Sequence, residues 1–486
     1  MVGMLVASMS VQTVDFSRKW YVMAAVSMGT LLATIDGSIV NVALPTLVRE
    51  LNTDFATVQW VVLAYLLTLA TLLPSIGRLA DMIGKKKIYT LGFVGFTLGS
   101  FLCGLASSIH LLIAFRVIQA VGATMILALG SAIVTESFPA SERGRALGIT
   151  GTMVSIGIVI GPTLGGVLID LFSWHWIFFV NIPIGILGVL MIMRFVPDIK
   201  PKGKQQFDFK GALTLFFSLL ALLFALTLGQ SAGFGDIRVL GLFTLGILLL
   251  ALFIAVEKRA SQPMIDLTLF RNLEFSTSLV TGYLTFVAVA GTLILMPFYL
   301  ENVLGYNTRH VGLLMAVLPV AMGIIAPIAG ATSDRFGTRI ITVIGLVILL
   351  IGYGAMSRLT VQTSALTFAL LFLPVGVGMG VFQSPNNSAI MGAASQDKLG
   401  IVSGMLALNR TLGQTTGIAI IGAIWAALTI YFARPTIISD AAEAAAPAQV
   451  AALQYTFIII AAVILVALFL AIWTLIKESP HRGLAD

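Results

Sequence analysis

The chain has 486 residues, of which 58% are hydrophobic and 10% charged, and its formal net charge is +7. A soluble protein of this length could not bury so much apolar surface, so the composition indicates a membrane protein. The single cysteine excludes a disulfide framework and a cysteine metal cluster, and the four scattered histidines lack ligand spacing. We therefore expect no metal site and no cofactor.

Fourteen apolar runs of about 20 residues, the length of a membrane-crossing helix, follow one another along the chain. They lie near residues 20–44, 56–76, 88–107, 110–134, 146–169, 175–196, 209–228, 239–256, 276–300, 311–330, 340–357, 364–391, 401–427 and 455–476. The first and ninth are expected to end close to Pro45 and Pro297, and the longest connection is expected at 431–454. The predicted fold is therefore an all-α membrane protein.

The basic residues fall mostly on one side of these runs. With the N-terminus in the cytoplasm, the inside segments hold 21 of the 28 lysines and arginines, and the outside segments hold five. Cytoplasmic segments of membrane proteins carry such an excess. We expect both termini in the cytoplasm, and the basic charge indicates topology rather than a nucleic-acid partner.

One six-span unit occurs twice in the sequence. Asp81 and Gly84 recur 253 residues later as Asp334 and Gly337, and Gly157 recurs 256 residues later as Gly413. Both copies run in the same sense. Two copies of six account for twelve of the fourteen runs, so the seventh and eighth runs are an insertion between them. The predicted organisation is two six-helix bundles with two additional helices between them: an N-terminal bundle at 1–196, a linker with the inserted helices at 197–274, and a C-terminal bundle at 275–486.

Asp36 is the carboxylate that lies deepest in an apolar run. A bare carboxylate in hydrocarbon is costly, so such a residue faces a water-filled cavity, meets a cation or takes up a proton. A fixed hydrogen bond between helices is the alternative.

A second charge, Arg116, lies in the fourth run at a depth similar to that of Asp36, with Gln119 one turn further on. Two opposite charges at one depth are expected to meet through the cavity and to form a proton switch, although a permanent structural pair is the alternative. In the second half, Arg410 lies near the depth of Asn386 without an acid, so backbone carbonyls and amides, or a substrate anion, must satisfy it; we favour the structural option. The predicted cavity residues are Asp36, Arg116, Gln119, Asn386 and Arg410.

The segment 77–87 is expected to be a tight cytoplasmic loop after the second run. Its glycines permit a reversal, its acid can face a helix start, and its lysines can anchor to headgroups. Because the pattern recurs after the tenth run, we interpret it as a latch between the halves rather than a mere topological anchor. Its residues are Gly77, Asp81, Gly84, Lys85, Asp334 and Gly337.

The fifth run carries glycines at spacing four, which predict a flat face for close helix packing, and a proline that predicts a bend. These residues are Gly157, Gly161, Pro162, Gly165 and Gly166.

Together these segments resemble the major facilitator superfamily, and within it the fourteen-span drug:proton antiporter branch. The segment 77–87 resembles the loop signature of the superfamily, 116–123 its span-four signature, and 157–166 the antiporter signature of exporters. The segments 35–45 and 174–185 are similar to the marks of the fourteen-span branch. The resemblance covers nearly the whole chain.

The resemblance implies two bundles that rock around a central cavity, with a proton gradient driving the export of lipophilic compounds across a bacterial cytoplasmic (inner) membrane. Protons, membrane lipid and small lipophilic substrates are the implied partners, and a periplasmic adaptor protein is a further candidate. Runs nine to fourteen lack interior acids, which favours neutral or monocationic substrates over divalent cations. The alternatives are a membrane enzyme or a receptor, neither of which fits the short loops and the duplication, and an exporter of an endogenous metabolite, lipid or siderophore.

Overall fold

The computed structural model describes residues 18–139, 142–198, 208–259, 267–393, 399–433 and 440–478. Every regular element within these segments is a helix. Fourteen helical segments are long and apolar enough to cross a membrane, which is the number that the sequence predicts.

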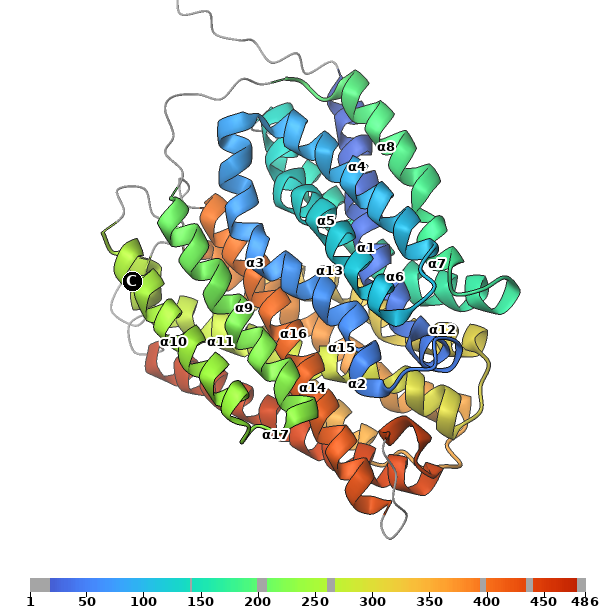
Figure 1. Ribbon diagram of the computed structural model, residues 1–486. Coiled ribbons are helices and arrows are strands. Elements are labelled where there is room, and N and C mark those ends of the chain that lie inside the picture. Colours follow the sequence, from blue (N-terminus) through green and yellow to red (C-terminus); the bar gives the residue numbers. More distant parts are fainter. Residues whose placement is uncertain are drawn as a thin grey trace, which may run out of the picture.

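The first part of the chain forms six of these spans. Its helices are α1 (Lys19–Glu50), α2 (Phe55–Val58), α3 (Trp60–Ile83), α4 (Lys85–Gly104), α5 (Ile109–Ser137), α6 (Arg143–Leu171), α7 (Trp176–Phe179) and α8 (Asn181–Phe195). Here α1 packs on α5, α6 and α8, while α4 packs on α5 and α8 and α3 packs on α5. We call these helices the N group (Figure 1).

The last part forms another six spans. Its elements are η3 (Leu267–Arg271), α11 (Leu273–Phe298), η4 (Tyr299–Val303), α12 (Thr308–Met315), α13 (Val317–Phe336), α14 (Thr338–Met356), α15 (Ala365–Gly392), α16 (Leu399–Phe432), η6 (Ala441–Glu443) and α17 (Ala446–Glu478). In this C group α11 packs on α15, α16 and α17, while α14 packs on α15 and α17. Helix α16 ends at Phe432, close to the expected start of the loop at 431–454, but α17 begins at Ala446, so the connection ends earlier than predicted.

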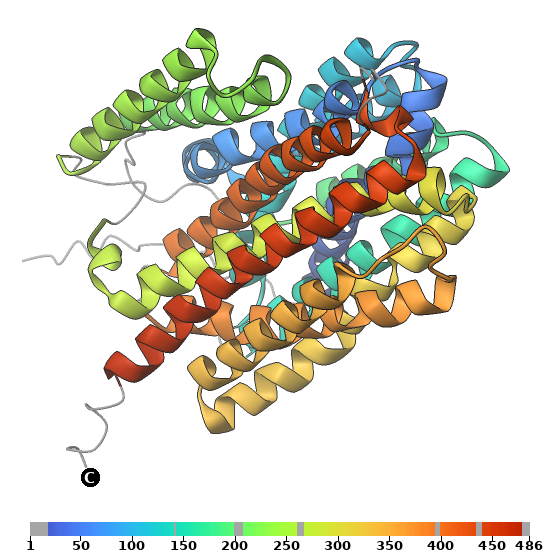
Figure 2. The ribbon, with the colours of Figure 1, turned by 90° about the horizontal axis from the view of Figure 1, so that it is seen from below.

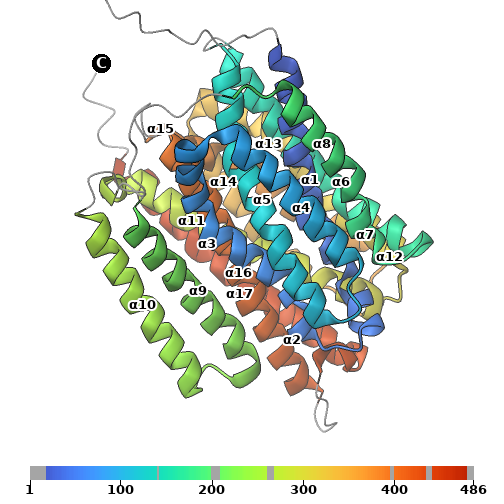
Figure 3. The same ribbon diagram turned by 45° about the horizontal axis from the view of Figure 1, so that its top comes forward.

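Two helices, α9 (Phe209–Ala232) and α10 (Ile237–Glu257), form a hairpin at one edge of the molecule. Figures 1 and 3 show α9 lying beside α3 and α16, with α10 on its outer side. Leucines of α9 share an apolar cluster with Ala70 of α3 and Leu408 of α16. The inserted hairpin therefore contacts both groups at the seam between them (Figure 2).

Prolines do not end the first and ninth spans, contrary to the sequence-based expectation. Helix α1 continues through Pro45 to Glu50, and α11 passes Pro297 and runs into the π-helical turn η4. A proline removes one backbone hydrogen bond, but neighbouring helices and local adjustment of the helix geometry compensate for that loss inside a membrane. Both prolines are buried among neighbouring helices.

The turn after the second span is shorter than predicted. Helix α3 reaches Ile83 and α4 starts at Lys85, so Gly84 alone joins them, and Gly77 is helical. Gly84 has φ +109°, and Gly337 joins α13 to α14 in the same way with φ +89°. A residue with a β-carbon rarely adopts such backbone angles. The matching turns support the duplication inferred from the sequence.

Gly84→Ala should therefore destabilise the protein by about 1–3 kcal/mol, the usual cost of forcing a side chain into such a backbone conformation. Space does not limit the change, because a β-carbon at Gly84 would have nothing within 4 Å. Gly77→Ala is the matched control: it is equally open but helical, so stability should be equal or slightly higher. Thermal unfolding of the purified variants measures both, and equal effects would contradict the assigned turn.

Candidate functional site

Asp36 lies near the middle of α1, which is enclosed by α5, α6 and α8. Its side chain is fully buried, and the side chain of Arg116 is 1% exposed. The Oδ2 atom of Asp36 lies 2.6 Å from Nη1 of Arg116. The predicted meeting of the two charges is therefore confirmed.

Amide groups complete the surroundings of the Asp36 carboxylate. Gln119 Nε2 donates to Oδ1 at 2.7 Å, and Asn181 Nδ2 of α8 donates to the same oxygen at 3.2 Å. Together the two carboxylate oxygens thus accept hydrogen bonds from three side chains, which belong to two helices. These donors satisfy the hydrogen-bonding groups of a carboxylate that water does not reach.

The Arg116 guanidinium is held from several sides. Its Nε donates to the carbonyl of Val61 at 3.0 Å, and its Nη1 also donates to Gln119 Oε1 at 2.7 Å. The ring of Tyr65 lies with its centroid 4.1 Å from the guanidinium carbon, a distance at which cation–π attraction acts. Because Val61 and Tyr65 belong to α3, the pair connects α1, α3, α5 and α8.

Helix α4 adds a hydroxyl to this network. Ser100 Oγ accepts from Gln119 Nε2 at 2.7 Å and from Asn181 Nδ2 at 3.4 Å. The neighbouring Gly99 makes this approach possible, since a β-carbon there would lie 2.5 Å from the Cα of Gln119. Cys103 Sγ lies 3.7 Å from Gln119 Oε1 and closes the network on this side.

Sequence reasoning selected Asp36, Arg116 and Gln119 but missed Ser100 and Tyr65. Neutral hydroxyls are common in membrane helices, so neither residue carried a signal of its own. Asn181 could have been found, because it is an amide inside an apolar run.

The network is closed to solvent in this conformation. Asp36 and Gln119 are fully buried, and Arg116 and Asn181 are each 1% exposed. The expectation that the pair meets across an open cavity is wrong, because the two residues meet inside the N group. Contact between Asp36 and water therefore requires a rearrangement of the helices around it.

The glycine face of α6 holds this helix against α1 on both sides of Asp36. A β-carbon at Gly157 would lie 1.9 Å from Thr34 Oγ1, and one at Gly161 would lie 1.9 Å from Ser38 Oγ. A β-carbon at Gly165 would lie 2.7 Å from Cγ1 of Ile39. The predicted close-packing face is confirmed, and it is directed at the segment that carries the acid.

The other residues of this motif face the C group. A β-carbon at Gly312 of α12 would lie 2.3 Å from the carbonyl oxygen of Pro162, and one at Gly166 would lie 2.5 Å from that of Thr308. The motif therefore joins α6 both to α1 and to α12. Helix α6 remains continuous from Arg143 to Leu171 through Pro162.

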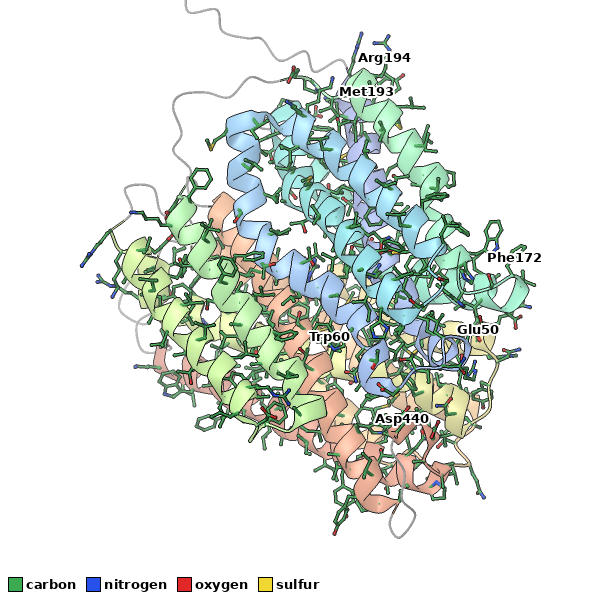
Figure 4. All side chains as sticks on the ribbon, viewed as in Figure 1. Glu50, Trp60, Phe172, Met193, Arg194 and Asp440 are labelled. Carbon is green, nitrogen blue, oxygen red and sulfur yellow. The ribbon has the colours of Figure 1, made fainter. Side chains whose placement is uncertain are left out.

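The two groups are bound together at the Glu50 end of α1. Arg49 Nη1 lies 2.8 Å from Glu301 Oε2, and the N–H of Phe55 donates to Asp440 Oδ2 at 3.2 Å. The Phe55 ring also packs between two rings of the C group, those of Phe298 at 4.9 Å and Trp425 at 4.8 Å. Figure 4 shows Glu50 and Asp440 at this end, and Met193 and Arg194 at the opposite end.

At the Lys19 end, the described ion pairs stay within one group. Lys19 pairs with Glu142 and Lys85 with Glu136 in the N group, whereas Arg339 pairs with Glu274 in the C group.

The remaining predicted residues are distributed as follows. Asn386 of α15 is buried and donates to the carbonyl of Ser278 at 3.1 Å. Arg410 of α16 is half-buried, and no hydrogen bond or ion pair joins it to any described residue. The side chains of Asp81 and Asp334 lie outside the described residues. Across the described segments, no group of three or more His, Cys, Asp or Glu is placed to hold a metal ion.

Two similar groups of six membrane helices, with a buried ion pair beside their interface, form the architecture of a secondary transporter. The family model described as the Major Facilitator Superfamily matches residues 26–418, and the chain belongs to this superfamily.

Curated relatives are similar over most of the chain. The riboflavin transporter RibZ of Clostridioides difficile (strain 630) is 35% identical over 418 residues, covering 85% of this chain and 90% of that protein. The multidrug resistance protein Stp of Mycobacterium tuberculosis is 35% identical over 404 residues, covering 83% of this chain and 75% of that protein. The multidrug transporter MdtP of Bacillus subtilis is 28% identical over 409 residues, covering 84% and 75%.

Solved structures share the fold at low sequence identity. A bacterial homologue of the human lysosomal transporter Spinster matches with TM-score 0.62 and 18% identity, over 94% of this chain and 96% of that one. The nucleoside transporter NupG matches with TM-score 0.64 and 13% identity, over 93% of this chain and 99% of that one.

Removing one partner of the buried pair should leave an uncompensated charge, so Asp36→Asn and Arg116→Gln should each destabilise the protein by about 3–5 kcal/mol. The double variant should cost less than the sum of the two, because neither charge then remains unpaired. Unfolding by sodium dodecyl sulfate in mixed micelles, followed by tryptophan fluorescence, gives the three values.

Arg238→Gln removes a cation from an exposed pair with Asp236 and should cause no measurable loss. Additive effects at Asp36 and Arg116 would show that the two side chains are not energetically coupled.

Proposed function

We propose that this chain is a proton-coupled antiporter that exports lipophilic, neutral or monocationic compounds across the cytoplasmic membrane by alternating access. The observation that supports the proposal best is the buried pair of Asp36 and Arg116, flanked by Gln119 and Asn181. Buried ionisable residues in membrane helices characteristically belong to ion or proton pathways. Multidrug relatives at 28–35% identity favour export of lipophilic compounds.

The proposed coupling uses Asp36 as the proton carrier. In the closed pair Asp36 is a carboxylate and Arg116 compensates its charge. When the helices move and separate the two side chains, the carboxylate takes up one proton from the side then open to water. When the pair forms again, that proton leaves to the other side and Arg116 stays protonated throughout, because arginine does not deprotonate in proteins.

The contacts between the groups support alternating access. We propose that residues 1–196 and 275–486 rock as two units and that the Lys19 end is cytoplasmic, as the distribution of basic residues indicates. The contacts of Arg49 with Glu301 and of Phe55 with Asp440 then close the outer side. Release of substrate outward requires these contacts to break.

In this proposal the segments around Gly84 and Gly337 close the cytoplasmic side. We propose that Asp81 and Asp334, one turn before these glycines, latch the cytoplasmic side when the transporter opens outward. Gly77 and Lys85 belong to the same segment, and the ion pair of Lys85 with Glu136 holds α4 to α5.

A second candidate function is export of an endogenous metabolite. The 35% identity to a riboflavin transporter favours it, since a polar heterocycle and a lipophilic drug could use the same coupling site. The two functions differ in substrate and share the proposed mechanism.

Asp36→Asn should abolish substrate-driven proton movement, since an amide cannot carry a proton through the cycle. Everted vesicles with an internal pH dye would show no response to added substrate, whereas wild type would. Asp236→Asn is the matched control, because that acid is outside the network and pairs with the exposed Arg238. A normal response in Asp36→Asn vesicles would remove Asp36 from the mechanism. Competition by riboflavin in wild-type vesicles would favour the metabolite function.

A further inference from the structure

Arg410 lies in the part of α16 nearer the Lys19 end, beside a row of residues that face α11. Asn409 donates to the carbonyl of Leu279 at 3.0 Å, and a β-carbon at Gly413 would lie 2.8 Å from the Cβ of Phe286. Successive residues of a helix are about 100° apart, so the side chain of Arg410 leaves the helix about 100° away from that of Asn409.

The face that carries Arg410 looks toward the N group. Arg410, Gln414, Ile418 and Gly422 follow one another at i, i+4, i+8 and i+12, which places them in one row along the helix. Further along this row, a β-carbon at Gly422 would lie 2.6 Å from Oε1 of Gln59, a residue of the N group. Arg410 therefore lies on the side of α16 that borders the region between the two groups.

Arg410 is a cation without a partner in the described structure. It is half-buried, and it makes no hydrogen bond, ion pair or aromatic contact there. Arg116, Arg49 and Arg339, by contrast, each pair with a carboxylate. An uncompensated guanidinium within a membrane span is costly. An anion bound to Arg410 would compensate that charge and accept its hydrogen bonds.

Two amide donors lie on the side of α16 that faces α11, at the level of Arg410 along the helix. At Gly282 of α11, a β-carbon would lie 3.1 Å from Asn386 Nδ2 and 3.3 Å from Asn409 Nδ2. Two amide nitrogens from α15 and α16 therefore converge where α11 has no side chain. Each donates to a backbone carbonyl in the structure, and each –NH2 group has a second N–H.

We propose that Arg410 is a specificity-determining residue that binds an acidic or strongly hydrogen-bond-accepting group, such as a carboxylate, sulfonate or phenolate, on an otherwise apolar substrate. A guanidinium can donate two parallel hydrogen bonds to such a group. The inference rests on the proposed transport function and revises its substrate class: acidic amphiphiles are preferred, neutral ones are tolerated, and the monocations included above are disfavoured by like charge at Arg410.

A matched pair of fluorescent probes tests this preference. Anilinonaphthalene sulfonate is an anion, and phenylnaphthylamine is the neutral molecule of the same skeleton without the sulfonate. Binding of each to the full chain in lipid nanodiscs, corrected with protein-free nanodiscs, is compared between wild type and variants. Arg410→Gln should weaken binding of the anionic probe about tenfold or more and leave the neutral probe unchanged. Arg410→Lys should retain part of the affinity.

Arg358→Gln is the charge control, because Arg358 is exposed in the turn after α14. It should change neither affinity, and the unfolding temperatures of all variants should agree. Equal effects of Arg410→Gln on both probes, no effect on the anion, or no binding of the anion by wild type would each overturn the inference.

The proposed function is tested separately by proton-driven uptake of the neutral probe into everted vesicles. Its absence in wild type would contradict antiport of this class of compound, while the binding measurement would still decide whether Arg410 selects anions.

Discussion

The buried contact between Asp36 and Arg116 is the interaction on which the N group depends. Neither charge would be stable alone in hydrocarbon, and together they draw α1 and α5 into contact. The helices around them come close enough because residues without side chains face the network. Gly99 lets α4 approach α5, while Gly157 and Gly161 let α6 approach α1 next to the acid. Close packing and the buried pair thus stabilise the same arrangement, and a change in one must disturb the other.

Much of this arrangement could be predicted from the sequence, since charges are rare in apolar runs. Asp36 and Arg116 could be placed at one depth by counting residues, and Gln119 followed from helical periodicity. The roles of Ser100 and Tyr65 depend on how neighbouring helices are rotated, and a single sequence does not encode that rotation in any simple pattern. The burial of Asp36 and Arg116 inside the N group depends on the same rotation, and the sequence does not predict it. Counting also failed at Pro45 and Gly84: a proline inside a packed membrane bundle need not end a helix, and a reversal needs no more than one glycine.

The two groups share a fold but differ in their charges. The N group balances its buried arginine with an acid, whereas Arg410 of the C group has no counterpart among the described residues. In the account proposed here, the N group carries the proton and the C group contributes to the choice of substrate. The contacts at the Glu50 end couple the two, because Arg49, Phe55 and Pro162 of the N group contact Glu301, Asp440 and Gly312 of the C group.

The central claim is that Asp36 exchanges a proton as its pairing with Arg116 changes. Infrared difference spectroscopy of the purified protein, recorded between neutral and acidic pH, tests this claim most directly, since a protonated carboxyl group has its own C=O stretching band. With isotope-labelled aspartate, the exposed aspartates contribute label-shifted bands in every variant, and the account predicts one additional label-shifted band, that of a buried carboxyl group, in wild type and in Asp236→Asn but not in Asp36→Asn. The same additional band in Asp36→Asn would show that another aspartate takes up the proton and would contradict the account.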